Sequence, residues 1–438
     1  MKKTLLLTLA AGLVSATPLM ANSDLFITGS TAFRANVHDA CAKLFTTKTE
    51  FTGTVATGGD SKTGNGAAQW TMSGTPIAGL TAISGTFTIH ALFTGSVQGI
   101  QTVEQSTKLL FIDASGNKMT NTPTIAFSDN SAAATPYPAT GNFNEEQVAV
   151  QPFVMCKAVP INNGLTSISN VSWEQLKYAI QAGRIPLSAW TTKTADHSSY
   201  VYLIERTKDS GTRRTEFAQE LDGYNQSAVV YLYDNTNNFF YKTNTSIAGA
   251  TGSSAAGVSV VGAAGNGNAN LNWGSGYVGG GDVKTELGYN NAANQAIGYL
   301  SFADAKGITG INWSQVLPFN GIWPTAAGSG VSGNTGTNDF SPITSGVYTC
   351  WGYEVVIYPT VDPSSINSDQ NLTVAQLGNQ STSGTILGVL DAVTVGTPLV
   401  GSIDNEIELS KTLSPGATAI RINDMVSSRA SVGGTITP

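Results

Sequence analysis

Three short segments rich in serine, threonine and glycine each join a predicted strand to a predicted helix: Gly29-Ser30-Thr31, Thr94-Gly95-Ser96 and Ser210-Gly211-Thr212. The N-terminus of a helix presents unpaired backbone N–H groups and the positive end of the helix dipole, so a turn of this kind can bind an anion. At any single turn the hydroxyl can instead be an ordinary helix cap. The charged residues near the turns therefore decide between the two interpretations.

Two charged residues accompany these turns. Arg206 lies four residues before Ser210, and Asp129 ends a short predicted strand of its own. A guanidinium can donate two hydrogen bonds to an oxyanion, and a carboxylate can accept a hydrogen bond from a ligand that still carries a proton. The combination predicts a site for an oxyanion that still carries a proton.

Catalytic and metal-binding arrangements are poorly represented. The histidines His38, His90 and His197 share no short motif, and no G-x-S-x-G or zinc pattern occurs. Ser210 has no base near it in sequence that would make it a nucleophile. The three glycines at 279–281 lack the lysine of a P-loop and are interpreted as a flexible tip. We therefore expect no catalytic residue, no metal site and no cofactor, and a protein that is not an enzyme.

The composition limits the classes of protein to which the chain can belong. The chain has 438 residues, which suggests two domains or one divided architecture. Hydrophobic residues make up 41% of it, enough for a folded core, whereas charged residues make up only 12%. The net charge is −7, and the basic residues form no run longer than a pair such as Lys2-Lys3, so the sequence argues against a nucleic-acid partner.

The N-terminal segment 1–21 is typical of a secretory signal peptide. Lys2 and Lys3 precede a short apolar run from Leu5 to Val14, and small-residue cleavage sites follow after Ala16 or Ala21. No later apolar run approaches the roughly 18 residues that a membrane helix needs. We therefore expect a periplasmic or secreted protein without membrane insertion.

Hydrophobic periodicity predicts the elements that position these turns. Three units follow the order strand, small-residue turn, helix, with strands near 25–27, 87–93 and 200–204. Segment 52–88 is rich in Gly, Thr and Ser and is interpreted as an elaborated loop or hairpin region, and segment 245–292 is interpreted as a surface insertion with few core residues. The other predicted elements are strands at 124–127, 148–158, 296–302, 347–358, 395–400 and 418–422, and helices at 172–183 and 385–393.

In this order, the segments resemble those of the phosphate-binding proteins of ABC importers. The likeness rests on Gly29-Ser30-Thr31-Ala32-Phe33, Thr94-Gly95-Ser96, Phe127-Ser128-Asp129 and Arg206 with Ser210-Gly211-Thr212, and it runs from about residue 27 to 358. It implies a type 2 periplasmic-binding-protein fold, an α/β fold of two lobes joined by two crossover strands. Lobe 1 would comprise 22–150 and 355–438, and lobe 2 would comprise 155–350.

The resemblance also implies a function and a site. The function is binding of inorganic phosphate in a cleft between the lobes for ABC-type phosphate uptake, with an ABC permease as partner. Lys208 departs from the family, which usually has an acidic partner for the arginine there. A surface or matrix protein that keeps the fold without transport, or a binder of another oxyanion, is the alternative. The residues that would contact phosphate are Thr31, Ala32, Ser96, Asp129, Arg206, Ser210, Gly211 and Thr212.

The cysteines Cys41, Cys156 and Cys350 lie far apart in the sequence. In the architecture that the resemblance implies, Cys156 and Cys350 belong to the two crossover strands, which lie side by side. Neighbouring strands bring facing residues within the range of a disulfide if the side chains point the same way. A Cys156–Cys350 bridge is therefore one expectation, and three buried free thiols are the alternative.

Overall fold

The structure is a computed structural model. It describes residues 22–53, 64–158, 167–219, 229–234, 239–242, 260–261, 276–288, 295–306, 315–326, 339–390, 420–429 and 436–437. The predicted signal peptide 1–21 and the predicted strand at 395–400 lie outside these ranges. Among the helices described, none combines the length and the apolar character needed to cross a bilayer.

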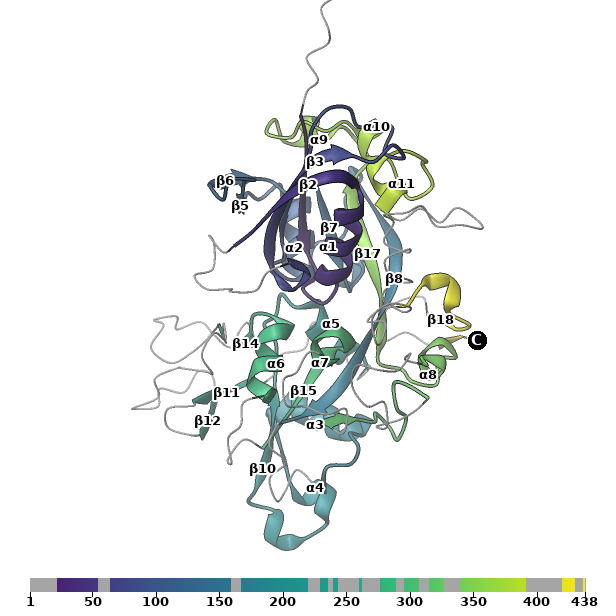
Figure 1. Ribbon diagram of the computed structural model, residues 1–438. Helices are drawn as coiled ribbons and strands as arrows, with labels where there is room; N and C mark the ends of the chain where they lie inside the picture. The colour runs from purple at the N-terminus through teal and green to yellow at the C-terminus, as the bar shows by residue number, and fades with distance from the viewer. Residues whose placement is uncertain are drawn as a thin grey trace, which may run out of the picture.

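One mixed sheet runs through both halves of the molecule, in the order β2-β3-β4-β1-β7-β17-β8-β15-β10-β9. In the upper half of Figure 1, the strands β4, β1 and β7 are parallel, so their carboxyl ends lie along one edge. The strands of this half are β1 (Ser23–Gly29), β2 (Phe45–Thr52), β3 (Gln69–Pro76), β4 (Phe87–Leu92) and β7 (Ile125–Ser128), with a separate hairpin of β5 (Leu109–Ile112) and β6 (Lys118–Asn121).

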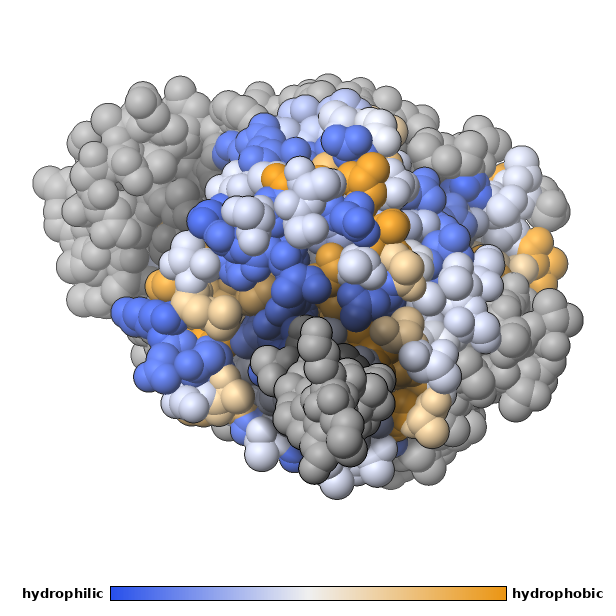
Figure 2. Space-filling view, turned by 90° about the horizontal axis from the view of Figure 1, so that it is seen from above, coloured by the Kyte–Doolittle hydropathy of each residue, from blue (hydrophilic) through white to orange (hydrophobic). Residues whose placement is uncertain are grey.

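Helices cover both faces of the upper part of the sheet. On one face α1 (Arg34–Lys43) packs through Val37 and Cys41, and α11 (Ile386–Leu390) joins the same apolar cluster. On the other face α2 (Ser96–Glu104) packs through Ile100 and Val103. The short helices α9 (Pro363–Ile366) and α10 (Val374–Leu377) complete this half. From above, the described surface of this half is mostly hydrophilic with scattered hydrophobic residues (Figure 2).

The lower half has its own apolar core, built on β8, β15 and β10. Its strands are β9 (Arg184–Pro186), β10 (Tyr200–Ile204), β11 (Tyr231–Asp234), β12 (Phe239–Lys242), β13 (Val260–Val261), β14 (Gly276–Tyr277), β15 (Ala296–Ser301) and β16 (Val316–Leu317). Its helices are α3 (Trp173–Ala182), α4 (Ser188–Thr191), α5 (Gly211–Gln219), α6 (Gly280–Gly288), α7 (Phe302–Lys306) and α8 (Ser341–Thr344). Near the chain end β18 (Ser428–Arg429) pairs with β19 (Ile436–Thr437).

Two long strands connect the halves. β8 (Phe143–Lys157) and β17 (Trp351–Pro359) pair antiparallel from Phe143↔Pro359 to Pro152↔Trp351, and Figure 1 shows them running side by side between the upper and lower parts. β8 then continues into the lower half, where it pairs with β15. This arrangement confirms the predicted α/β architecture of two lobes joined by two crossover strands.

Several local predictions are confirmed by the elements themselves. The helix predicted at 172–183 is α3, which begins after Ser172 in a capping box with Gln175 and ends at Gly183 with φ 73°. α2 begins at Ser96, the last residue of the small-residue turn after which a helix is predicted. The structure describes residues 420–422 of the strand predicted at 418–422. Within them, Ile420 forms a single β-bridge with Val150 of β8.

Other predictions need correction. Segment 276–288, interpreted as part of a surface addition with a flexible tip, contributes the buried residues Tyr277, Gly280 and Leu287 to the lower half. Residues 355–438 were assigned to lobe 1, but Ile420 belongs to the core of the lower half, because its backbone pairs with β8 at Val150. The composition of neither segment indicates these contacts, which depend on distant partners.

The Cys156–Cys350 bridge is also corrected, because all three cysteines are buried free thiols. The backbone N–H of Phe153 donates to the carbonyl of Cys350, so Cys350 stands beside Phe153, while Cys156 is opposite Gly298 and Val316. The register of the crossover strands thus separates the two sulfur atoms. Burial raises the pKa of each thiol, which makes all three poor nucleophiles.

Candidate functional site

The site begins where β1 and β7 end. The backbone N–H of Ser30 donates to the carbonyl of Phe127 at 2.7 Å, which brings the β1–α1 turn against the end of β7, directly before Asp129. Gly29 has φ 114°, and a Cβ there would lie 1.9 Å from that carbonyl oxygen. A glycine is therefore required for this close approach, and it is what places Ser30 and Thr31 next to Asp129.

The second lobe contributes the turn before α5. The backbone N–H of Val97 in α2 donates to the carbonyl of Asp209 at 3.2 Å, which joins the N-terminal ends of α2 and α5 across the two lobes. Figure 1 accordingly shows α5 at the top of the lower lobe. A Cβ on Gly211 would lie 1.5 Å from Oδ1 of Asp129, so only a glycine permits this contact between the lobes.

Asp129 lies at the centre of these turns, with 1% of its surface exposed. The Ser96 hydroxyl donates to Oδ1, and the Thr212 hydroxyl donates to Oδ2 at 3.3 Å, so the carboxyl receives donors from both lobes. Burial raises the pKa of Asp129 above its ordinary value, and the Ser96 hydroxyl and the charge of Arg206 offset only part of this effect.

Arg206 follows β10 and is 2% exposed. Its Nη1 donates to Thr212 Oγ1 and its Nη2 donates to Thr31 Oγ1, each at 3.4 Å, so the guanidinium also bridges the lobes. Nε and Nη2 donate to the carbonyls of Tyr277 and Val278 at 3.2 and 2.9 Å. The two residues directly before the glycines 279–281, which were interpreted as a flexible tip, therefore hold the arginine in place.

Asp304 is a charged neighbour of Arg206 that the sequence did not reveal. Of the carboxylates that favour the charged form of Arg206, it has the largest effect, ahead of Asp129. Burial raises the pKa of Asp304, but the charges of Arg34, Lys284 and Arg206 lower it by more. An acidic partner thus exists for the arginine even though Lys208 occupies the usual position. The one sequence pattern that points to this part of the chain is Ser301-x-x-Asp304, which is typical of a helix start. Ser301 Oγ accepts a hydrogen bond from the Asp304 N–H and caps α7.

The structure brings most of the predicted residues into contact. Thr31, Ser96, Asp129, Arg206, Gly211 and Thr212 form one cluster through these contacts. Ala32 is buried beside Thr31 in the same turn. Ser210 caps α5, because its Oγ accepts a hydrogen bond from the Arg213 N–H at 3.2 Å. The capping interpretation is therefore correct for that hydroxyl, and it leaves the other donors of the turn unaffected.

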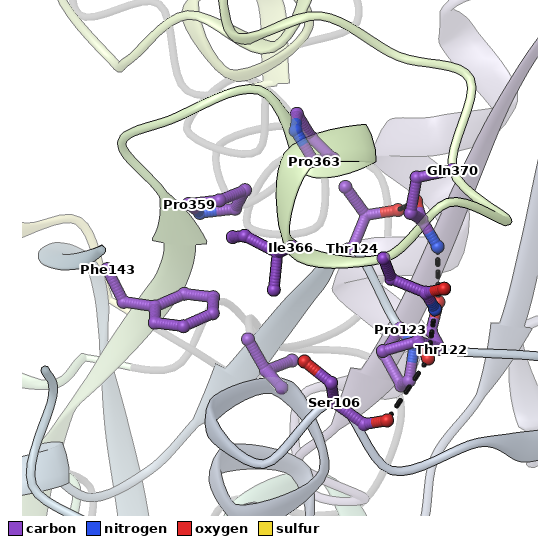
Figure 3. A pocket seen from close by; sticks show the side chains of 11 residues that line it. Ser106, Thr122, Pro123, Thr124, Phe143, Pro359, Pro363, Ile366 and Gln370 are labelled. Atoms are coloured by element: carbon purple, nitrogen blue, oxygen red, sulfur yellow. Dashed lines mark hydrogen bonds between the residues drawn. The ribbon is translucent and has the colours of Figure 1, made fainter.

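A second hollow lies at the opposite end of β7. Figure 3 shows it between the residues that precede β7, the start of β8 and helix α9. Its polar groups bond to one another: Gln370 Nε2 donates to the Thr122 carbonyl at 2.6 Å, and Thr122 Oγ1 donates to the Ser106 carbonyl at 3.3 Å. None of its lining residues is charged, so this hollow offers little to an ionic ligand.

His38 forms the other notable polar cluster, away from the site. Its Nδ1 lies 2.8 Å from Asp39 Oδ1 and its Nε2 lies 2.9 Å from Glu50 Oε1, which ties α1 to β2. Within the described ranges, no group of three or more His, Cys, Asp or Glu side chains is arranged to hold a metal ion.

No protein-family model and no curated protein matches the chain. Solved structures do resemble it. An ABC-type phosphate transport receptor from Vibrio cholerae is 12% identical over 79% of this chain and 91% of its own, with a TM-score of 0.37. PstS from Borrelia burgdorferi is 12% identical over 78% and 90%, with a TM-score of 0.30. A high-affinity periplasmic phosphate-binding protein is 12% identical over 91% and 90%, with a TM-score of 0.38. At these values the likeness carries no conclusion about function.

Proposed function

We propose that this protein binds one inorganic phosphate ion between its two lobes, in contact with Thr31, Ser96, Asp129, Arg206 and Thr212. The observation that carries the proposal is the arrangement around Arg206. One buried guanidinium reaches the hydroxyls of Thr31 and Thr212, which belong to different lobes, and Thr212 together with Ser96 donates to the buried carboxyl of Asp129. A tetrahedral oxyanion has the acceptors that such a set of donors needs, and it would hold the lobes together through them.

Asp129 supports phosphate over other oxyanions. At neutral pH phosphate keeps at least one proton and can donate it to a carboxylate, whereas sulfate keeps none and would oppose its negative charge to that of Asp129. The net charge of −7 is no obstacle, because a dehydrated anion responds to donors aimed at it and hardly to distant surface charges. The same set of donors, without Asp129, would suit either anion.

The wider role is a further part of the proposal. Export to the periplasm or the cell exterior rests on the pattern of residues 1–21. Delivery of phosphate to an ABC permease rests on the family resemblance of the sequence segments. Both parts stay predictions, and a phosphate-binding protein without a transport partner would fit the same site.

Isothermal titration calorimetry with phosphate and with sulfate tests the proposal. We expect one phosphate per chain and no comparable heat with sulfate. Asp129→Asn should mainly reduce the discrimination, by about 1–3 kcal/mol, because the amide no longer repels sulfate. No heat with phosphate, or equal affinities for the two anions in the unmutated protein, would refute phosphate as the ligand.

A further inference from the structure

A second carboxyl stands beside Asp129 and takes no part in the cluster around Arg206. Glu354 lies in the crossover strand β17 and is fully buried. β17 pairs antiparallel with β7, with Val355 opposite Ser128 and Val356 opposite Phe127. Glu354 and Asp129 are the next residues beyond the last pair, Val355 and Ser128, and the charge of Asp129 acts on Glu354.

The two carboxyls have different surroundings. Asp129 receives hydrogen bonds from Ser96 and Thr212 and lies near the positive charge of Arg206. Glu354 has only the Ser30 hydroxyl near it as a donor, and neither of its oxygens makes a well-formed hydrogen bond within the described residues. A buried carboxylate with so few donors costs far more free energy than a buried carboxylic acid. Two adjacent buried carboxyls do not both ionise easily, so the charge belongs on Asp129.

Among the side chains around Glu354, Asp129 is the charged one that acts on it. From the β1–α1 turn the neighbour is the neutral Ser30 hydroxyl, and from β8 the opposing residue is Ala149. α2, which packs against β17, has Glu104 as its one titratable residue, and Glu104 is bonded to Thr140 beyond the C-terminal end of the helix. Burial and the charge of Asp129 raise the pKa of Glu354 well above its ordinary value, and Ser30 lowers it by less.

We propose that Glu354 is a positioning residue that must carry a proton when phosphate binds, so that phosphate binding at Asp129 is coupled to the protonation of Glu354. This inference rests on the proposed function. The neutral acid leaves Asp129 as the one ionised carboxyl that accepts the ligand's proton. When Glu354 loses its proton, a second negative charge appears beside Asp129 and the bound anion, and binding weakens. Conversely, the bound anion retains the proton on Glu354.

The test is a pH series of phosphate affinities for the unmutated protein and for Glu354→Gln, a neutral side chain of the same shape. The ionisation of phosphate itself changes with pH in the same way for both proteins. The ratio of their dissociation constants therefore reports only the effect of Glu354. We expect similar affinities at pH 6 and a ratio that rises with pH toward about tenfold per unit above the pKa of Glu354. Glu146→Gln is the matched control, since Glu146 lies in β8 opposite Val356 and bonds to Tyr358, and its ratio should stay flat.

The possible failures are distinct. Phosphate binding with superimposable pH profiles for the unmutated protein and Glu354→Gln up to pH 10 overturns the coupling and leaves the proposed function intact. No phosphate binding by the unmutated protein overturns the proposed function, and the coupling with it. If Glu354→Gln does not fold, calorimetry of the unmutated protein in buffers of different ionisation enthalpy counts the protons taken up with phosphate between pH 8 and pH 10. Uptake approaching one proton supports the coupling, and no uptake refutes it.

Discussion

Arg206 shows how a single residue can make both the shape and the charge of a site. Its guanidinium donates to hydroxyls on two lobes and to two backbone carbonyls, so each of its three nitrogens is engaged. A lysine would keep the positive charge beside Asp129 and Asp304 but not the planar fork. The two properties can therefore be separated by experiment.

Arg206→Lys should weaken phosphate binding by about 1.5–3 kcal/mol, or roughly 10- to 150-fold, because hydrogen bonds from a charged donor are lost while the charge remains. Calorimetry measures the affinity, and thermal unfolding checks that the variant is folded. Arg421→Lys, in a partly exposed ion pair with Asp424, is the control and should bind like the unmutated protein. An unchanged affinity in Arg206→Lys would show that the fork does not contact the ligand.

His38 supports a prediction about stability. Burial lowers the pKa of His38, but its hydrogen bonds to Asp39 and Glu50 and their charges raise it by more, so the pKa in the folded protein exceeds 6.5. The stability that His38⁺ contributes is therefore complete below pH 6.5 and is lost as the pH rises through the higher, folded-state pKa. His38→Gln should lower the melting temperature more at pH 6 than at pH 9. An equal decrease at both values would contradict a charged His38.

At the scale of elements, the site depends on the close approach of two helix N-termini. Gly211 at the start of α5 meets Asp129 and Ser96 from the other lobe, and a Cβ there would lie 2.6 Å from Ser96 Oγ as well. The free-energy cost of forcing a methyl group into such a contact is about 1–3 kcal/mol. The contact exists only when the lobes are together, so it affects binding more than folding.

Gly211→Ala should therefore bind phosphate roughly 5- to 150-fold more weakly, with a melting temperature close to that of the unmutated protein. Gly141→Ala is the matched control, because nothing lies within 4 Å of its added Cβ. A Gly211→Ala variant that binds as tightly as the control would mean that the lobes do not approach in this way when the ligand binds.

Elements with local signals were predictable from the sequence. The capping box at Ser172 and Gln175 with Gly183 defines α3, and β10 occupies the predicted residues 200–204, because these patterns depend on near neighbours. The turns at 29–31, 94–96 and 210–212 were predictable for the same reason. Asp304 and the carbonyls of Tyr277 and Val278 were not, since they reach Arg206 only through the packing of α6 and α7 on β15.

At the scale of the whole molecule, β8 and β17 connect the two lobes, and Glu354 sits in that connection beside Asp129. The sequence predicted the two crossover strands but not their register, which sets Cys350 beside Phe153 and away from Cys156. It also did not predict that Ile420, near the chain end, pairs with β8. Pairings across hundreds of residues are set by the assembled core, and no local pattern records them.

A structure of the protein determined with phosphate bound tests the central claim most directly. We expect one phosphate ion between the lobes, with oxygens within hydrogen-bond distance of Arg206, Thr31 and Ser96, and with one protonated oxygen donating to Asp129. Phosphate bound elsewhere, or crystals grown in saturating phosphate in which Arg206, Thr31 and Thr212 contact only one another, would contradict it.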